Sequence, residues 1–244
     1  MTPERFKKAV TVLNQRQPDL TVVTDEVHKS QNISAIIRTC DAVGIMELHS
    51  VYDADTFRAH TGTTLGTHKW VKTNVYPSIN TPLINLKNDK YQIVAADISS
   101  LTVDYRDIDY TRPTALLLGA EKFGVSMAAR EHVDQFISIP MQGMVESFNV
   151  SVACAIILAE AHKQRESLGF YSSRQISDEY FRETILEWTH PLVARYCQKH
   201  SLRYPDLDDQ GDIEDQAWRS QYTNKIGADA TYDEGSGGDA CLFD

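Results

Sequence analysis

Two hydrophobic patterns alternate between residues 20 and 165 of the chain. Short, nearly continuous apolar runs predict strands, because strands buried on both faces carry few polar positions. Longer stretches with apolar residues three and four positions apart predict helices. The predicted strands are residues 20–27, 47–52, 91–96 and 114–118, and the predicted helices are residues 33–43, 125–132 and 150–164. We therefore expect an α/β domain with a mostly parallel sheet, helices on both faces and ligands at the carboxyl ends of the strands.

The two ends of the chain carry helical patterns without strands. Apolar side chains recur at helical spacing over residues 5–16, and Pro18 ends this pattern. A second helical stretch follows Gly169, and a segment rich in Gly and Asp closes the chain. The predicted organisation is a basic N-terminal helix at residues 1–18, the α/β domain at 19–168, a C-terminal helical extension at 169–226 and a disordered acidic tail at 227–244.

The formal net charge of −10 comes mostly from one end of the chain. Residues 201–244 hold 11 acidic and 3 basic side chains, which leaves 23 acidic and 21 basic side chains in residues 1–200. Lys and Arg supply most of the affinity of proteins for phosphates, so the overall charge argues against a nucleic-acid partner. The nearly neutral body and the basic N-terminal helix remove that objection.

The composition gives no sign of export or of a membrane partner. The first twenty residues lack the apolar core of a signal peptide. The longest apolar stretch, at residues 150–159, is shorter than the roughly 18 residues that span a bilayer. We expect a cytoplasmic protein with reduced thiols, because the four cysteines are far apart and form no CxxC pair: Cys40, Cys154, Cys197 and Cys241.

Familiar catalytic signatures are missing from the sequence. The eight histidines form no HExxH motif and no close pair, so we expect no metal site. Residues 119–124 read GAEKFG, but Val125 and Ser126 follow where a phosphate-binding P-loop carries Lys and Ser or Thr. No GxSxG nucleophile elbow is present. Any chemistry must therefore use a less familiar arrangement.

Three segments place polar residues where an apolar strand meets an apolar helix. They are residues 32–38 (NISAIIR), 116–124 (LLLGAEKFG) and 139–153 (IPMQGMVESFNVSVA). The third begins with an irregular apolar loop, whose main-chain groups need partners if the loop is buried. A ligand with adenine-like edges and a flat, uncharged ring suits such a loop.

Each polar residue also suits a purely structural role. Asn32 and Asn149 are favoured types for helix N-caps, while Glu121 and Ser147 suit a solvated turn and a loop. Arg38 follows Asn32 by six residues, about 600° around a helix, so the two side chains do not share a face. On its apolar helix, Arg38 either reaches solvent or pairs with an anion.

The order of the three segments changes this picture. NISAIIRT, LLLGAEKFGVS and IPMQGMVESFNVSVACAI resemble the three motifs of the SpoU/TrmH family of SPOUT RNA ribose 2′-O-methyltransferases. The segments RFKKAVTVLNQRQPDLTVV, HKSQNISAIIRTCDAVGI and VDYRDIDYTRPT also resemble bacterial members that methylate guanosine 18 of tRNA. The resemblance covers roughly residues 3–220, and only the acidic end of the chain lies outside it.

The resemblance implies a fold, a cofactor and partners. The α/β domain is expected to end in a deep C-terminal trefoil knot, and the protein is expected to be a homodimer that binds S-adenosylmethionine and tRNA without a metal or a membrane. The implied cofactor-binding residues are Ala96, Leu118, Gly119, Ile139, Met141 and Phe148. Two of these depart from the family pattern, because Ala96 stands where Thr is familiar and Phe148 where Leu is.

The resemblance also assigns catalytic and RNA-binding residues. Arg38 matches the proposed catalytic arginine, although a guanidinium is essentially always protonated and so suits an orienting cation better than a base. The polar residues that complete the catalytic site are Asn32, Glu121, Ser147 and Asn149. The expected RNA-binding residues are Arg5, Lys8, Arg16, Lys163, Arg165 and Tyr171.

Two other functions remain open at this point. The first is methylation of ribosomal RNA, but such relatives often carry a separate N-terminal RNA-binding domain, and this chain has only a short helical extension. The second is a non-catalytic RNA-binding dimer with the same fold. The intact set of polar motif residues argues against that second alternative.

Overall fold

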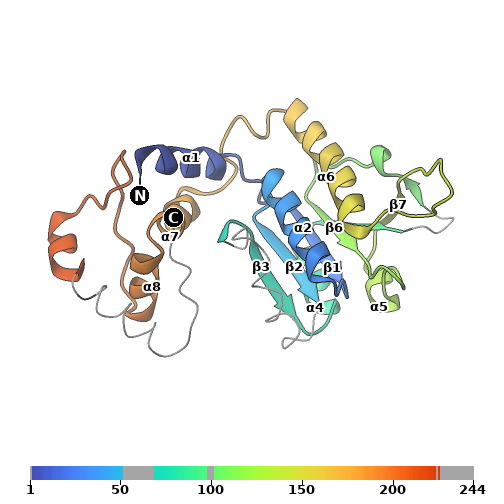
Figure 1. Ribbon diagram of the computed structural model, residues 1–244, viewed down its shortest axis with the longest axis horizontal. Helices are drawn as coiled ribbons and strands as arrows, with labels where there is room; N and C mark the ends of the chain where they lie inside the picture. The colour runs from blue at the N-terminus through green and yellow to red at the C-terminus, as the bar shows by residue number, and fades with distance from the viewer. Residues whose placement is uncertain (1, 52–68, 98–101, 224, 226–244) are drawn as a thin grey trace. The chain divides into compact units, whose positions relative to one another are not determined.

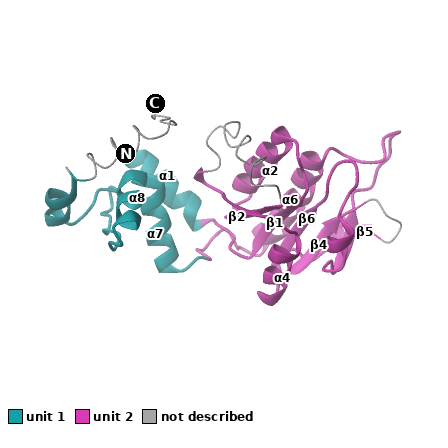
Figure 2. Cartoon of the chain, turned by 90° about the horizontal axis from the view of Figure 1, so that it is seen from below, with its two compact units in different colours: residues 1–14, 176–244 teal, residues 15–175 magenta. Residues whose placement is uncertain are grey.

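The computed structural model describes residues 2–51, 69–97, 102–223 and 225, and these fall into two compact units. One unit is Gln15–Gln175, and the other combines Met1–Asn14 with Ile176–Asp244 (Figure 2). The α/β pattern of the sequence lies in the first unit, and the helical patterns of the two chain ends lie in the second. The predicted acidic tail at residues 227–244 lies outside the described residues.

A parallel sheet forms the centre of unit 15–175 (Figure 1). In the described part of the chain its strand order is β3-β2-β1-β6-β4-β7-β5, and each pair of neighbours is parallel. This confirms the predicted α/β domain with a mostly parallel sheet. The strands are β1 (Leu20–Asp25), β2 (Glu47–Val51), β3 (Lys72–Tyr76), β4 (Gln92–Ala96), β5 (Val103–Asp104), β6 (Thr114–Leu118) and β7 (Gln135–Ser138).

Helices cover both faces of the sheet, as predicted (Figures 1 and 2). Helices α2 (Ser30–Ala42) and α6 (Val150–Ser167) pack together on one face, where Leu116 and Leu118 of β6 point. Helices α4 (Asn80–Asn88) and α5 (Met127–Arg130) pack on the other face, where Ala115 and Leu117 point. Alternate residues of β6 therefore enter two separate cores, which explains its continuous apolar sequence.

The register of the sheet brings several strand ends to one edge. Leu118, the last residue of β6, pairs with Thr24 of β1 on one side and with Ala96 of β4 on the other. Ala96, the last residue of β4, pairs in turn with Ile137 of β7. Because these strands are parallel, the segments that follow them leave the sheet side by side. This edge is where the sequence motifs meet.

The second unit joins the two helical ends of the chain. Helix α1 (Pro3–Asn14) packs against α7 (Asp178–Thr189), and α8 (Pro191–Lys199) follows α7 directly. Phe6 and Leu13 are the buried residues of α1, and a Cβ on Gly211 would lie 2.5 Å from the ring of Phe6. The helices at the two ends of the chain thus belong to one compact unit, which combines residues 1–14 with residues 176–244.

The structure also adds elements that the hydrophobic pattern did not predict. Strands β3 and β7 and helix α4 were missed because their apolar positions are few and interrupted by polar ones. The predicted helix at residues 125–132 is shorter, because α5 spans only Met127–Arg130. The deep trefoil knot stays a prediction.

The cysteines within the described residues are buried and free. Cys40 of α2 and Cys154 of α6 lie in the core between these helices. Burial raises the pKa of the Cys154 thiol to about 12 and that of Cys40 well above its ordinary value. Cys197 is also free, which confirms the expectation of unpaired thiols for these three residues, and Cys241 lies outside the described residues. No helix in the described part of the chain is long and apolar enough to span a membrane.

Two arginines that were expected to bind RNA are instead fully buried. Arg165 of α6 pairs with Asp19 at 2.5 Å and donates from Nε to the Tyr110 carbonyl oxygen at 2.8 Å. Arg16 pairs with Asp41 at 2.6 Å and donates to the Ile45 carbonyl oxygen at 3.1 Å. Neither side chain has exposed surface for a phosphate, so the structure corrects both assignments. These arginines instead connect segments at the end of the sheet opposite the motif residues.

Replacing Arg165 by Ala is expected to lower the free energy of unfolding by about 3 kcal/mol, because Asp19 and the carbonyl oxygens of Tyr110 and Arg112 lose their donor. Lys163 is the matched control on the same helix, since its side chain is 76% exposed and forms an ion pair with Glu160. Lys163→Ala should change the free energy by less than about 0.5 kcal/mol. Urea denaturation followed by circular dichroism measures both values, and equal losses would contradict a structural role for Arg165.

Candidate active site

Three of the predicted catalytic residues form one chain of hydrogen bonds. Asn149 donates from Nδ2 to Oδ1 of Asn32 at 3.2 Å, and Asn32 donates from Nδ2 to Oε1 of Glu121. The second oxygen of Glu121 forms an ion pair with Nζ of Lys29. The residues come from the three segments identified in the sequence, which are far apart along the chain. The fold therefore brings these segments together at one place.

Asn149 has both of the roles that the sequence left open. It is the N-cap of α6, where its Oδ1 accepts from the main-chain N–H of Ser151 at 2.9 Å. Its Nδ2 is then free to donate to Asn32. Asn32 is not a cap, because the N-cap position of α2 is Lys29, whose side chain makes no capping bond. Asn32 is buried within the first turn of α2, so its side chain needs the partners that Asn149 and Glu121 provide.

Glu121 lies on a tight loop that closes on itself. Ala120 and Gly124 exchange two main-chain hydrogen bonds, of 3.0 and 2.8 Å, and Gly124 has a φ of +66° that favours glycine. A Cβ on Gly119 would lie 2.1 Å from the carbonyl carbon of Gly124, so only glycine fits there. The glycines of GAEKFG therefore shape a loop that presents Glu121 to Asn32.

Asp25 supports this loop from the end of β1, although it belongs to none of the three sequence motifs. Its buried carboxylate accepts from the main-chain N–H of Ser126 at 2.8 Å. Ser126 in turn caps α5 by accepting from the N–H of Ala129 at 3.3 Å. Glu26, the next residue after Asp25, has a φ of +56°, a conformation that costs energy for a residue with a side chain. Backbone strain of this kind tends to occur beside functional sites.

The predicted cofactor-binding residues gather at the same edge of the sheet. Ala96 and Leu118 are paired strand ends, Gly119 follows directly, and Ile139 begins the loop after β7. None of the hydrogen bonds between described residues uses the main chain of residues 140–148. Met141 is half-buried and the side chain of Phe148 is 40% exposed. This loop offers apolar surface together with free main-chain donors and acceptors, which suits a flat ring with polar edges.

Arg38 and Ser147 are not joined to this hydrogen-bonded chain. Both residues are exposed, and neither side chain forms a hydrogen bond or ion pair with another described residue. Of the two alternatives for Arg38, the structure supports a side chain that reaches solvent. Lys29 was missed as a site residue, although it stands only three positions before Asn32. The signal in the sequence for Lys29 was its basic side chain close to the first motif.

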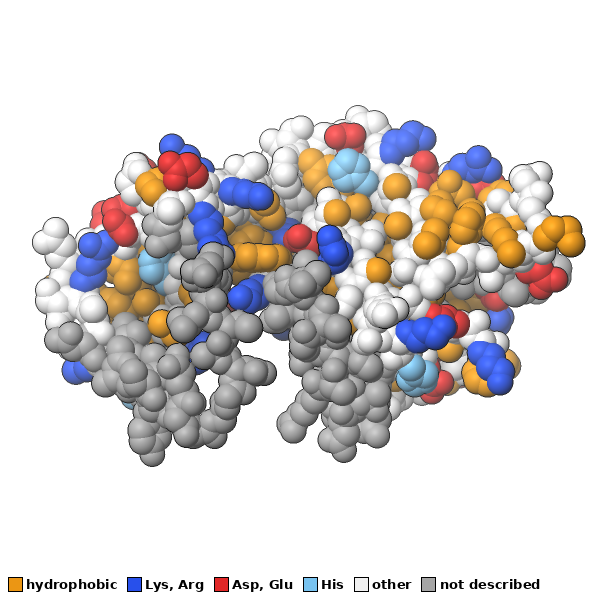
Figure 3. All heavy atoms as spheres, viewed as in Figure 1, with side chains coloured by type: hydrophobic (Ala, Val, Ile, Leu, Met, Phe, Trp, Pro, Cys, Tyr) orange, Lys and Arg blue, Asp and Glu red, His pale blue; other side chains and the backbone are white. Residues whose placement is uncertain are grey.

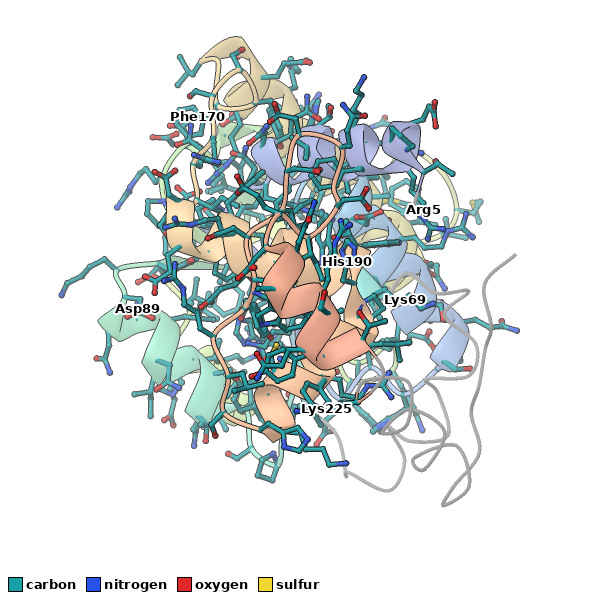
Figure 4. All side chains as sticks on the ribbon, turned by 90° about the vertical axis from the view of Figure 1, so that its left-hand side faces the viewer. Arg5, Lys69, Asp89, Phe170, His190 and Lys225 are labelled. Atoms are coloured by element: carbon teal, nitrogen blue, oxygen red, sulfur yellow. The ribbon has the colours of Figure 1, made fainter. Side chains whose placement is uncertain are left out.

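The remaining RNA-binding candidates differ in exposure. Arg5, labelled in Figure 4, and Lys8 are exposed residues of α1, and Lys163 is exposed on α6. Tyr171 is half-buried, donates its hydroxyl to the Val43 carbonyl oxygen at 2.8 Å and packs against the ring of His162. Arg5, Lys8 and Lys163 therefore have surface available for a phosphate, whereas Tyr171 is already bonded within its own unit. Within the described residues, no group of three His, Cys, Asp or Glu side chains could hold a metal ion.

Comparison with known proteins gives a consistent result. Residues 19–159 match the SpoU rRNA Methylase family, and residues 163–216 match the C-terminal region described as SpoU, rRNA methylase. The chain is 41% identical over 216 residues to the tRNA (guanosine(18)-2′-O)-methyltransferase of Escherichia coli K12, covering 88% of this chain and 94% of that protein.

Solved structures agree with the sequence comparison. The A. aeolicus TrmH/SpoU tRNA modifying enzyme is 42% identical with a TM-score of 0.70, covering 76% of this chain and 94% of that one. The SpoU methyltransferase AviRb from Streptomyces viridochromogenes, in complex with the cofactor AdoMet, is 30% identical with a TM-score of 0.53, covering 63% and 62%. The shared parallel sheet, the matched residues and the motif residues gathered at one sheet edge lead to one conclusion: the chain belongs to the SpoU rRNA methylase family.

Proposed function

We propose that this protein transfers the methyl group of S-adenosylmethionine to the ribose 2′-oxygen of guanosine 18 in tRNA. The observation that carries this proposal is the hydrogen-bonded chain of Asn149, Asn32 and Glu121, which joins the three motif segments at the carboxyl edge of the sheet. The relative from Escherichia coli named for this activity covers most of the chain, and it supports tRNA over ribosomal RNA as the substrate.

The residues at the sheet edge fit the proposed cofactor. The free main-chain groups of residues 140–148 can bind the edges of adenine, and Ile139 and Met141 offer apolar surface to its faces. Ala96, Leu118 and Gly119 form the base of the site at the strand ends. Phe148, in place of the familiar Leu, adds a larger apolar surface beside the loop. No ionised side chain is needed to hold an uncharged ring there.

The proposed reaction needs alignment and the removal of a proton. S-adenosylmethionine supplies a methyl group that is activated by its positively charged sulfur. A bond forms between the ribose 2′-oxygen and the methyl carbon, the bond from that carbon to sulfur breaks, and the hydroxyl proton leaves to solvent or a base. Holding the attacking oxygen in line with the breaking bond accounts for much of the rate in such displacements.

Arg38 is proposed to orient the ribose. Its exposed guanidinium has no partner among the described residues, so its donors are available to an incoming nucleotide. The planar fork of donors can bind a phosphate oxygen and the neighbouring 2′-oxygen together. Because the group stays protonated, we assign it the role of an orienting cation that stabilises negative charge on the oxygen.

Glu121, Asn32 and Asn149 are proposed to position the site. Both carboxylate oxygens of Glu121 already accept, one from Asn32 and one from Lys29. Glu121 is therefore better suited to hold the loop than to take the proton of the ribose. Ser147, which is exposed just before Asn149, adds a hydroxyl that can contact substrate or cofactor.

The exposed basic residues support tRNA as the partner. Arg5 and Lys8 on α1 and Lys163 on α6 can contact phosphates, while Lys29 and Arg38 place positive charge beside the motif residues. Structured RNA is recognised largely through its shape and backbone, so a distributed basic surface is sufficient. We also propose that the protein acts in the cytoplasm, because its proposed substrate is tRNA.

The proposed activity is tested with S-adenosylmethionine labelled on its methyl group. Incubation with unmodified tRNA should transfer label to the 2′-oxygen of guanosine 18, and nuclease mapping should find no other labelled nucleotide. Ribosomal RNA in a parallel reaction should stay unlabelled. Transfer to ribosomal RNA alone would show that ribosomal RNA, and not tRNA, is the substrate. No transfer to either RNA would favour the non-catalytic alternative.

Arg38→Ala is expected to lower kcat by at least about 100-fold, because the 2′-oxygen loses the donor that orients it. The dissociation constant for S-adenosylmethionine should stay within about twofold, since Arg38 lies outside the loops assigned to the cofactor. Arg38→Lys keeps the charge without the planar fork, so its kcat should lie between the values for the wild type and for Arg38→Ala. Single-turnover kinetics and calorimetry separate these effects, and wild-type turnover by Arg38→Ala would remove Arg38 from the mechanism.

We also propose that two copies of the chain associate through the apolar surface next to this site. Figure 3 shows hydrophobic side chains gathered over the loop before α6 and the start of that helix. Exposed apolar surface of this kind marks an interaction site, and a second copy would bury it. Its most exposed member is Met144, with a fully exposed side chain, and the surface consists of Met144, Val145, Phe148 and Val152.

Placing charges in this apolar surface is expected to separate the dimer. The double variant Val145→Asp and Val152→Asp introduces carboxylates that would lose hydration on association. Ile84→Asp is the control, since Ile84 is a similarly exposed apolar residue on α4, which covers the opposite face of the sheet. Sedimentation equilibrium should show a dimer for the wild type and for Ile84→Asp, and a monomer for the double variant. A monomeric wild type would contradict the proposal.

A further inference from the structure

We propose that Arg130 is a positioning residue that holds three segments of the cofactor site in register. This inference deepens the proposed function, because it concerns the binding of S-adenosylmethionine at the same site. Arg130 carries no motif signal in the sequence. It is the last residue of α5, the short helix that follows the Glu121 loop.

One guanidinium contacts all three segments. Arg130 donates from Nη2 to Oδ2 of Asp97 at 2.5 Å and from Nε to the Val125 carbonyl oxygen at 3.2 Å. Its central carbon lies 5.0 Å from the centre of the Phe136 ring, which is a cation–π distance. Asp97 follows β4, Val125 follows the Glu121 loop, and Phe136 belongs to β7. Arg130 therefore connects the end of β4, the loop after β6 and strand β7.

These three segments also carry the proposed cofactor residues or lie directly before them. Ala96 directly precedes Asp97, Gly119 begins the loop that ends before Val125, and Ile139 stands three positions after Phe136. The main-chain N–H of Asp97 also donates to the Ile137 carbonyl oxygen at 2.9 Å, which ties the end of β4 to β7. A shift of Arg130 would therefore be transmitted to each of the three segments that carry these residues.

The arrangement requires arginine rather than any cation. The Asp97 side chain is only 8% exposed, so its carboxylate needs a close charged donor. The Nε and Nη2 atoms donate outward within one rigid plane, which allows one group to reach Asp97 and Val125 while the face of that plane covers Phe136. A lysine ammonium can pair with Asp97 but cannot keep all three contacts.

A purely stabilising ion pair is the competing explanation, and Lys87 offers a matched control. Lys87 of α4 pairs with Asp134, whose carboxylate also accepts from the main-chain N–H of Ile93 at 2.8 Å. This pair therefore links the same helical layer to the starts of β4 and β7, at the opposite end of these strands. Lys87→Ala should change stability without reaching the cofactor site.

The test measures binding of S-adenosylhomocysteine to the full chain by isothermal titration calorimetry. Arg130→Lys should raise its dissociation constant about tenfold, and Asp97→Asn, which keeps a neutral acceptor, about threefold, since misplacement of about 1 Å at a site is costly. Lys87→Ala should stay within about twofold of the wild type, as should tRNA binding by all variants. With saturating tRNA, the KM for S-adenosylmethionine should rise more than kcat falls.

Two outcomes would overturn the assignment of Arg130. One is an unchanged dissociation constant in both Arg130→Lys and Asp97→Asn. The other is an equal loss in Lys87→Ala, which would show a general effect of stability, and thermal unfolding of each variant identifies that case. Failure of the wild type itself to bind S-adenosylhomocysteine would instead refute the proposed cofactor. Thermal unfolding of the Arg130 and Asp97 variants would then show only whether Arg130 stabilises the fold.

Discussion

The site depends on the register between β6 and its two neighbours. Because Leu118 pairs with both Thr24 and Ala96, the segments after β1, β6 and β4 leave the sheet at one level. A shift of β6 by one residue would also exchange its two sets of apolar side chains between the two cores. The packing of α2 and α6 on one face and α4 and α5 on the other therefore fixes the position of the Glu121 loop.

Two pairs of basic residues in unit 15–175 differ in their burial. Arg165 and Arg16 are buried and hold chain segments at the end of the sheet away from the motifs. Lys29 and Arg38 are exposed beside the motifs, where a polyanion can reach them. The nearly neutral charge count of the body thus conceals an uneven distribution, in which some cations contribute to stability and others remain available to a substrate.

The sequence predicted those strands and helices whose own residues show a clear hydrophobic pattern. Residues 114–118 form β6 as expected, because a strand buried on both faces must be apolar throughout. Strand β7 was missed, because Gln135 and Ser138 break its apolar pattern and its burial comes from neighbouring strands. The polar chain from Asn149 to Glu121 was expected only through family resemblance. The burial of Arg165 was not foreseeable, since nothing near it in the sequence reveals its distant acceptors.

The two roles of Asn149 exclude other residue types that are equally good helix N-caps. Its oxygen caps α6 while its amide nitrogen donates to Asn32. Asp, Ser and Thr are good caps, but an ionised Asp has no side-chain donor. The short side chains of Ser and Thr carry a single oxygen, which cannot reach both the capped N–H and Asn32. The first turn of α6 and the orientation of Glu121 are thereby set by one carboxamide. A substitution of Asn149 would therefore affect both the start of α6 and the hydrogen bond to Asn32. The helix cap alone would tolerate several residue types, but the two roles together restrict this position to Asn.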